Sequence, residues 1–179
     1  MGKPLNRGNG TNVRNVRNKK ESMLLKTKKR IIGRHELIDL PALELFAVEA
    51  KIDTGAYTSA IHCTDIREAT LPDGTPVIRF NLLDPSHPKY HHKIFEFTKF
   101  SLRDIKSSFG DVQERYVIRT QIQLFDKILE TDFSLSDRRD MKYPILIGRA
   151  VLRKHFIVDV ARKNVSAKAK KEKTGKKKL

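Results

Sequence analysis

The stretch KIDTGAYTSAIH, residues 51 to 62, places a carboxylate, Asp53, directly before Thr-Gly-Ala. A carboxylate held on a tight loop can take a proton from a water molecule and so act as a general base. The tripeptide alone is weak evidence, because Asp and Gly are also common turn residues. Asp53 is therefore either a catalytic carboxylate or an ordinary turn residue, and the elements around it must decide.

A strand is predicted directly before Asp53. In FAVEAKI, residues 46 to 52, apolar residues at the even positions alternate with Ala, Glu and Lys at the odd ones. This period of two is typical of a half-buried strand that ends at Asp53. Gly55, on the loop that follows, permits backbone conformations closed to other residues and lets another chain approach closely. A carboxylate in this position is what an aspartic peptidase needs.

A second informative stretch is YPILIGRAVLRKHFIVDV, residues 143 to 160. Its aliphatic run predicts a buried strand that packs beneath the Asp53 loop, and helical periodicity follows over residues 148 to 156. Gly148 lies between them. We expect it to be required because the two backbones nearly touch there.

The rest of the central region alternates in the same way, for example in VIRTQIQL at 117 to 124 and KIFEFTKFSL at 93 to 102. Strands bounded by Gly, Pro, Asp and Ser turns dominate, and a second helical stretch is considered only at 59 to 66. The sequence predicts an all-β barrel or sandwich with one short helix near its carboxyl end.

Charge divides the chain of 179 residues into three parts. The formal net charge is +16, but residues 1–30 carry +9, residues 162–179 carry +8, and residues 31–161 carry −1. The ends lack the apolar content to form a core, so we expect disordered tails at 1–30 and 163–179 around one folded domain at 31–162. No apolar run approaches the ~20 residues that cross a bilayer.

The basic tails suggest two kinds of partner and a third, neutral possibility. They could bind RNA or the ribosome through counterion release, attract an acidic protein, or only raise solubility. The single cysteine, Cys63, allows no disulfide within the chain, and the amino terminus has no secretory apolar segment. We therefore expect a cytoplasmic protein with no membrane partner.

Four blocks of the sequence resemble a known family. The chain is similar to retropepsin-like aspartic peptidases, and more closely to a bacterial group labelled "ATP-dependent zinc protease", sometimes found beside an ATP-grasp glutamate ligase acting on a ribosomal protein. The resemblance implies a retropepsin-like acid-protease barrel with one short C-terminal helix. The blocks are IGRHELIDLP (32–41), AKIDTGAYTSAIH (50–62), DVQERYVIRT (111–120) and LSDRRDMKYPILIGRAVLRKHFIVDVAR (135–162).

The resemblance also implies the chemistry. One Asp-Thr-Gly per chain requires a C2 homodimer, in which Asp53 of each subunit meets at the axis and the pair activates water for peptide hydrolysis. The expected substrate is a protein or peptide, with an acidic or glutamylated tail as one candidate. The expected activity is that of an aspartic-type endopeptidase without a cofactor.

Residues around Asp53 would support it in this family. Thr54 would hydrogen-bond across the axis, or else only cap its own turn. Gly55 and Ala56 would leave room for substrate. Gly148 and Arg149 would be structural, with Arg149 tying the dimer or the active-site loops together through ion pairs, although Arg149 could instead be a solvated helix residue.

By order along the chain, KSSFGD contains the tip of the flap, a hairpin that closes over substrate. Its residues would be Ser108, Phe109 and Gly110, and the alternative is an exposed hairpin aromatic. Residues 70–95 contain an inserted hairpin of open role. Tyr57, Thr58 and Ser59 follow the motif where viral retropepsins often have acidic residues, so peptide specificity does not transfer.

The chain has no recognised motif for binding the zinc or the ATP that the family label names. There is no G-x-x-x-x-G-K-[ST] loop and no H-E-x-x-H, so we expect no metal and no nucleotide. A zinc site would need residues without recognised spacing, namely His35, His62, Cys63, His87, His91 and His92. Two alternatives stay open: a non-catalytic module of the same fold that binds RNA through the tails, and a metallopeptidase.

Overall fold

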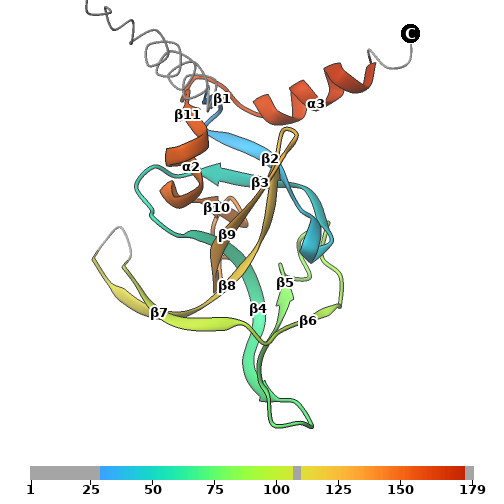
Figure 1. The fold of residues 1–179 in the computed structure, drawn as a ribbon, viewed down its shortest axis with the longest axis vertical. Helices are drawn as coiled ribbons and strands as arrows, with labels where there is room; N and C mark the ends of the chain where they lie inside the picture. The colour runs from blue at the N-terminus through green and yellow to red at the C-terminus, as the bar shows by residue number, and fades with distance from the viewer. Residues whose placement is uncertain (1–28, 107–109, 176–179) are drawn as a thin grey trace, which may run out of the picture.

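The computed structural model describes residues 29–106 and 110–175. Strands dominate this part of the chain, as the alternating patterns predicted, and the all-β class is confirmed (Figure 1). The elements in chain order are β1 (Arg30–Ile32), β2 (His35–Leu40), the 3-10 turn η1 (Pro41–Leu43), β3 (Leu45–Ile52), β4 (Ser59–Thr70), β5 (Pro76–Leu82), β6 (Ile94–Phe97), β7 (Phe100–Lys106), β8 (Val112–Leu124), β9 (Lys127–Ser136), β10 (Ile145–Ile147), α2 (Arg149–His155), β11 (Phe156–Val158) and α3 (Val165–Gly175).

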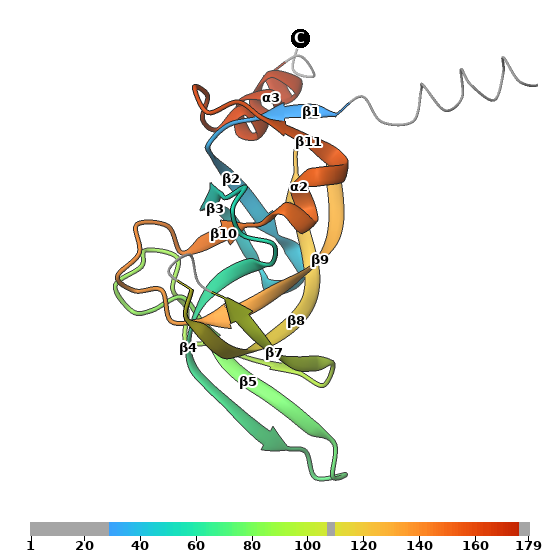
Figure 2. The same ribbon diagram turned by 90° about the vertical axis from the view of Figure 1, so that its left-hand side faces the viewer.

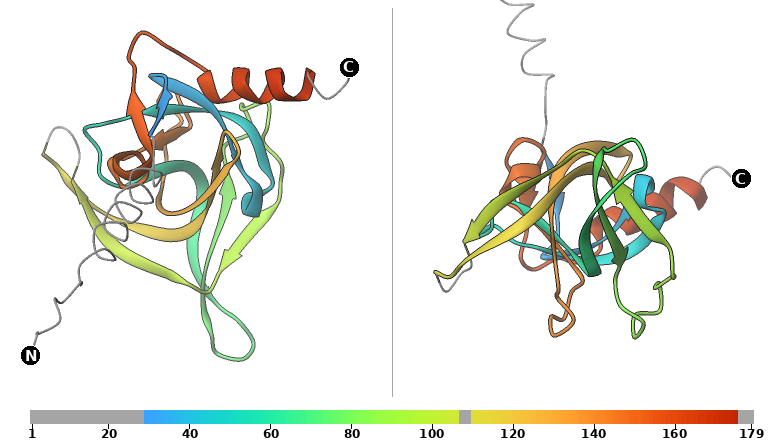
Figure 3. Two further views of the ribbon diagram at one scale, coloured as in Figure 1. Left: turned by 45° about the horizontal axis from the view of Figure 1, so that its top comes forward. Right: turned by 90° about the horizontal axis from the view of Figure 1, so that it is seen from below.

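The main sheet closes on itself. Its strands follow the order β10, β3, β2, β8, β9 and β4, and β4 pairs in turn with β10. Closure leaves this ring of strands without a free edge, as in a barrel. The curled sheet can be followed from two further sides in Figure 3. Its interior is filled by aliphatic and aromatic side chains, of which Ile38, Val48, Ile118, Phe133 and Ile145 are fully buried.

Strand β4 leaves the ring halfway along its length. Its first residues pair with β9 and β10, and its last residues pair with β5, which in turn pairs with β6. The β4–β5 hairpin projects from the body of the molecule in Figure 2. The predicted insertion is thus a β4–β5–β6 extension of the sheet.

The prediction of a second helical stretch at 59 to 66 is wrong, because these residues belong to β4. Every side chain from Ser59 to Cys63 is buried, so apolar and small residues run without the alternation that marks a half-buried strand. Burial of both faces of a strand removes the period of two and imitates a buried helix.

The C-terminal boundary also differs from the prediction. We expected residues 163–179 to be disordered, but residues 165–175 form α3, which contacts β2. Val165 and Ala169, four residues apart and hence on one helix face, pack against the core. Residues 1–28 and 176–179 of the predicted tails lie outside the described residues.

A buried carboxylate fixes the start of α3. Glu36 of β2 is fully buried and accepts hydrogen bonds from the backbone amides of Val165 (3.0 Å), Ser166 (2.9 Å) and Gly33 (2.7 Å). The first amides of a helix have no partner within it, and a negative charge is favourable at that end. A residue far away in sequence therefore caps this helix.

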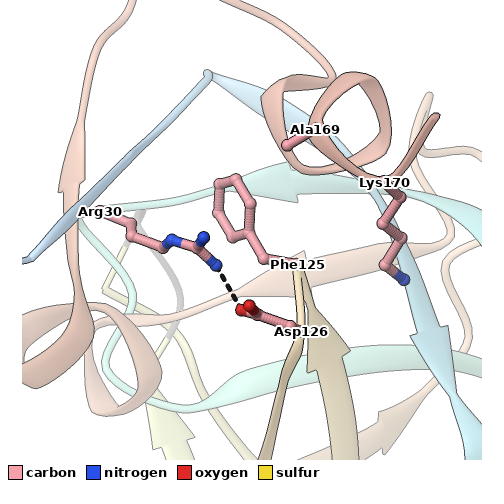
Figure 4. A pocket seen from close by; sticks show the side chains of 5 residues that line it. All are labelled: Arg30, Phe125, Asp126, Ala169 and Lys170. Atoms are coloured by element: carbon pink, nitrogen blue, oxygen red, sulfur yellow. Dashed lines mark hydrogen bonds and ion pairs between the residues drawn. The ribbon is translucent and has the colours of Figure 1, made fainter. Parts of the chain in front are cut away.

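Strands β1 and β11 form a separate parallel pair at the same end of the molecule as α3 (Figures 1 and 2). A small hollow lies between β1, the β8–β9 turn and α3 (Figure 4). In it Arg30 forms an ion pair with Asp126 and stacks over the ring of Phe125, 4.5 Å from its centroid. No helix within the described ranges is long and apolar enough to cross a membrane.

Candidate active site

Asp53 lies where β3 ends, beside the end of β10. Ile52 pairs with Ile147 in the parallel β3–β10 ladder, and the amide of Asp53 donates to the carbonyl of Ile147 at 2.9 Å. The aliphatic run before Gly148 thus forms the strand that was predicted to pack against the Asp53 loop. Hydrogen bonds from a buried strand hold the backbone that carries this carboxylate.

The two oxygens of the Asp53 carboxylate have different surroundings. Oδ1 accepts hydrogen bonds from the amides of Gly55 (2.9 Å) and Ala56 (3.2 Å). Among the residues that the structure describes, none donates a hydrogen bond to Oδ2. One oxygen is therefore used to shape the loop, and the other is available to a water molecule or a second carboxylate. The side chain is half-buried.

Gly148 lies against the backbone of the same loop. A Cβ atom there would come within 2.5 Å of the carbonyl oxygen of Tyr57 and 2.8 Å of the carbonyl carbon of Thr58. Contacts under about 3 Å with backbone leave no room for any side chain. The expectation that glycine is required at this point because two backbones nearly touch is confirmed.

The start of α2 binds the Asp53 loop through backbone and side chain. The amides of Arg149 and Ala150 donate to the carbonyls of Ala56 (2.8 Å) and Tyr57 (3.0 Å). The guanidinium of Arg149 donates to the carbonyl of Thr54 at 3.3 Å. Arg149 thus contacts the loop of its own subunit through a backbone carbonyl, whereas the ion pairs expected for it are not found among the described residues.

Thr54 and Gly55 are exposed on the outer side of this loop. The structure shows no side-chain hydrogen bond of Thr54 within the described part of the chain. A bond across a dimer axis remains a prediction for Thr54.

The predicted flap falls on a β-hairpin. Strands β7 and β8 are antiparallel and pair from Phe100–Ile118 to Lys106–Val112. Gly110 has φ of 98°, a conformation that favours glycine. Ser108 and Phe109 lie outside the described residues, and their role stays a prediction.

Sequence reasoning missed two buried hydroxyls that support the loop. Ser59 Oγ accepts a hydrogen bond from the amide of Gly148 at 3.2 Å, and Ser134 Oγ donates to the carbonyl of Ser59 at 3.3 Å. The available signal was the presence of small hydroxyl residues directly after Asp-Thr-Gly-Ala. These bonds link β4, β9 and the start of α2 behind Asp53.

His62, considered above only as a possible zinc ligand, connects two loops near the site. Its Nδ1 accepts a hydrogen bond from the amide of Arg138 (2.9 Å), so the ring proton lies on Nε2, which donates to Asp84 (2.9 Å). Hydrogen bonds from Ser86, supported by His62, lower the pKa of Asp84 to about 2.

This geometry does not suit the zinc of the family label. Both ring nitrogens of His62 are engaged in hydrogen bonds, and Cys63 is buried. Across the described ranges no three His, Cys, Asp or Glu side chains converge in a way that could hold a metal ion. Zinc prefers four such ligands in a tetrahedron, and we derive no step through a metal.

Comparison with known families gives a match over most of the chain. Residues 31–169 match the family model of RimB-like proteins, described as "Retropepsin-like aspartic endopeptidase RimB". The match extends beyond residue 162 into α3, which agrees with the docked helix.

Curated relatives carry a different name. The chain is 38% identical over 135 residues to a "Probable alpha-L-glutamate ligase" of Shewanella halifaxensis, covering 73% of this chain and 28% of the relative. It is 31% identical over 148 residues to a protein of the same name from Desulfotalea psychrophila, covering 83% and 32%. The chain thus spans less than a third of the relatives it matches.

A solved structure has a similar fold. The crystal structure of a Legionella pneumophila protein of unknown function superimposes with a TM-score of 0.55 at 25% identity, covering 76% of this chain and 98% of that one.

Proposed function

Because the chain belongs to the RimB-like family of retropepsin-like aspartic endopeptidases, we propose that it hydrolyses peptide bonds with a pair of Asp53 carboxylates across a homodimer. The observation that carries this proposal is that the two oxygens of the Asp53 carboxylate differ in their hydrogen bonds. Its Oδ1 is fixed by two loop amides, and Oδ2 accepts no hydrogen bond from the described residues. The loop itself is held from behind by Gly148, Arg149 and Ser59.

The dimer follows from the number of carboxylates. The chain has one Asp-Thr-Gly, and an aspartic peptidase uses two carboxylates. A C2 axis brings the same residue of two subunits together. Exposure of Thr54 and Gly55 on the outer side of the loop supports an axis at this position.

The mechanism uses one proton shared between the two carboxylates. Like charges at hydrogen-bonding distance do not both ionise easily, so one carboxylate of the pair keeps a proton. The ionised member takes a proton from a bound water, which attacks the peptide carbonyl. The protonated member donates its proton to the carbonyl oxygen, which gives a gem-diol. The first member then passes its proton to the leaving nitrogen as the C–N bond breaks, and the second member takes a proton back from a hydroxyl group of the gem-diol. No covalent intermediate forms.

The proposed substrate is a protein tail that carries added glutamates, and the proposed compartment is the cytoplasm. Support comes from the relatives named probable alpha-L-glutamate ligase, in which the matched segment is a minor part of a longer chain. The basic ends of this chain would attract an acidic tail or the ribosome that carries it.

Asp53→Asn tests the proposal, with Asp73→Asn as the matched control. Asp73 also accepts an amide two residues ahead, from Thr75 at 2.9 Å, but in the exposed β4–β5 turn. We expect Asp53→Asn to lower cleavage of a glutamate-extended peptide by at least about 10²- to 10⁴-fold, and Asp73→Asn to leave it unchanged. New termini are followed by mass spectrometry.

A chelator arm separates the alternatives. Activity that survives Asp53→Asn and disappears with chelator would identify a metallopeptidase. No cleavage between pH 4 and 8 by a verified dimer, together with salt-sensitive RNA binding that Asp53→Asn does not alter, would instead support the binding module. The charges of +9 and +8 at the two ends are the observation that favours this second candidate.

A further inference from the structure

His62 connects two loops through both its side chain and its backbone. It lies on β4, and only 2% of its side chain is exposed. The Nδ1 atom accepts the amide of Arg138 at 2.9 Å, and Nε2 donates to Oδ2 of Asp84 at 2.9 Å. The backbone amide of His62 donates to the carbonyl of Pro144 at 2.8 Å, and its carbonyl accepts the amide of Leu83 at 2.9 Å. A buried polar residue with all of its groups engaged fixes the position of both loops.

The β9–β10 loop, residues 137–144, is bound by His62 near both of its ends. Arg138 at the start of the loop binds the ring, and Pro144 at its end binds the backbone. A further hydrogen bond, from the amide of Met141 to the carbonyl of Arg138, lies within the loop itself. The ring of His62 therefore contributes the hydrogen bond that attaches the start of the loop to β4.

This loop leads directly into the strand that supports Asp53. Strand β10 begins at Ile145, and the carbonyl of Ile147 in β10 accepts the amide of Asp53 at 2.9 Å. Ile145 also pairs with Ile61 of β4, the residue before His62. A shift of the loop therefore acts, through β10, on the backbone that carries the Asp53 carboxylate. Misplacement of a reacting group by about 1 Å can lower a rate about 10²-fold.

The hydrogen bond between His62 and Arg138 exists only while Nδ1 carries no proton. A ring nitrogen without a proton accepts a hydrogen bond, whereas both ring nitrogens are donors in the imidazolium ion. Histidine is the side chain that ordinarily changes its charge between pH 5 and 8. After protonation, the Nδ1–H group and the amide of Arg138 would face each other as two donors. A buried donor without an acceptor costs free energy, so this arrangement favours movement of the loop.

Carboxylates on both loops face the His62 ring. Asp84 binds Nε2, and Asp137 places its Oδ1 atom 3.7 Å from Nδ1. Hydrogen bonds from Arg139 lower the pKa of Asp137, so this carboxylate is ionised in the range where histidine titrates. His87 of the β5–β6 loop also interacts electrostatically with His62. A protonated ring thus has a new acceptor for Nδ1 within the same β9–β10 loop.

We propose that His62 is a positioning residue for Asp53, and that it acts only while its ring is neutral. Protonation exchanges the amide of Arg138 for the carboxylate of Asp137 as the partner of Nδ1. The exchange shifts the start of the β9–β10 loop and lowers kcat. Its effect on kcat rests on the proposed function, whereas the exchange of hydrogen bonds does not. Peptide hydrolysis therefore declines on the acid side through a group other than the Asp53 carboxylates.

NMR of the wild-type protein tests the exchange without any substitution. At pH 8, the nitrogen chemical shifts of the His62 ring should show a proton on Nε2 and none on Nδ1. As pH falls to 5, Nδ1 should gain a proton, and hydrogen exchange of the Arg138 amide, corrected for its intrinsic pH dependence, should become about 5- to 10-fold faster. A ring that stays neutral over this range, or an Arg138 amide whose protection does not change while His62 titrates, overturns the proposal.

His87 provides a matched control. Its Nδ1 atom also accepts a backbone amide, from Lys89 at 3.1 Å, but within its own loop. His87→Gln should leave the pH dependence of exchange at the Arg138 amide as it is in the wild-type protein. If this variant removes the pH dependence, His87 and not His62 is the group that responds, and the proposal is wrong.

Two substitutions of His62 separate positioning from packing. His62→Asn keeps an acceptor near the place of Nδ1 and gains no proton, whereas His62→Leu has no acceptor. With a glutamate-extended peptide, His62→Leu should lower kcat about 10- to 100-fold, with KM within about twofold. His62→Asn should restore kcat at pH 8 to within about threefold of the wild-type value and should lack the decline toward pH 5. Equal kcat in the two variants per folded molecule, determined by thermal unfolding, would show a merely structural role.

Asp137→Asn tests the second partner of Nδ1. The substitution removes the negative charge that stabilises the protonated ring, so the acid decline of kcat and the change in exchange at the Arg138 amide should both begin at lower pH. An unchanged pH profile would contradict the exchange of partners.

The NMR and kinetic measurements distinguish this inference from the proposed function. Hydrogen exchange in an Asp53→Asn background should show the same response of the Arg138 amide as in the wild-type protein. If the response is found but no peptide is ever cleaved, the peptidase proposal fails and the exchange of hydrogen bonds stands. If peptide is cleaved and His62→Asn keeps the wild-type pH profile, the peptidase proposal stands and the positioning role of His62 is overturned.

Discussion

Asp53 and Glu36 are two carboxylates that bind backbone amides, at different places in the same barrel. Glu36 is fully buried and receives three amides, which occupy both of its oxygens. Asp53 is half-buried and receives two, both at Oδ1. Glu36 follows no recognisable motif, whereas Asp53 precedes Thr-Gly-Ala.

The difference shows what separates a structural carboxylate from a reactive one. When both oxygens accept backbone amides and the group is fully buried, water does not reach it, and its role is to fix the chain. When one oxygen accepts the amides and the other accepts none, the loop is fixed and the second oxygen can still bind a water molecule or a second carboxylate. The comparison predicts that Glu36 variants change stability and Asp53 variants change chemistry.

Glu36→Gln should give the largest change in stability. A glutamine amide would place a donor against backbone donors, and α3 would lose the cap that holds its first turn. We expect a loss of about 2–3 kcal/mol in the free energy of unfolding, measured by urea denaturation, with faster hydrogen exchange in α3. Glu49→Gln, on the exposed side of β3, is the control.

Asp53→Asn should leave the free energy of unfolding nearly unchanged, because the asparagine oxygen can accept the same two amides. Similar losses of stability in the two variants would break the distinction between the carboxylates.

A pair of glycines sharpens the comparison at the level of the backbone. A Cβ at Gly148 would meet the carbonyl of Tyr57 at 2.5 Å, and a Cβ at Gly33, beside Glu36, would meet the carbonyl of Arg162 at the same distance. Both alanine variants should therefore lose about 1–3 kcal/mol. Only Gly148→Ala should also lower kcat per folded molecule, because it displaces the Asp53 loop. Equal kcat in both variants would contradict a precisely held loop.

A third carboxylate, Asp84, extends the comparison to stability at low pH. Asp84 uses both oxygens, for Ser86 and for His62, and its pKa of about 2 lies below its ordinary value of 3.8. A lowered pKa stabilises the fold above pH 4, and this contribution is lost as pH falls from 4 to 2. Wild-type stability should fall more steeply than that of Asp84→Asn over this range in denaturant titrations. Parallel curves would show that Asp84 does not anchor its loop.

Lys170→Ala should have the smallest effect. Its ammonium group binds Asp39 at 2.7 Å, near the surface of α3. Ion pairs of this kind contribute about 0–1 kcal/mol. A larger loss, measured by urea denaturation at low and high salt, would mean that side-chain charge and not the Glu36 cap holds α3 in place.

The sequence predicted a structural feature correctly where the residues that cause the feature are neighbours in the chain. Alternation predicted the strands, and the glycine after an aliphatic run predicted the close approach of Gly148 to the Asp53 loop, since only a missing side chain explains that position. The cap of α3 could not be predicted in this way, because Glu36 is remote from it in sequence and carries no distinguishing neighbour. Strand β4 was partly mistaken for a helix because burial on both faces removes alternation.

The pairing of β1 with β11, and the docking of α3 against β2, bring the two ends of the described chain to one end of the barrel (Figures 1 and 2). Residues 1–30 and 162–179, with charges of +9 and +8, are therefore attached at the same pole, while residues 31–161 sum to −1. Because both basic segments join the described chain at this pole, a polyanion that binds either of them would be held closest to this end of the barrel.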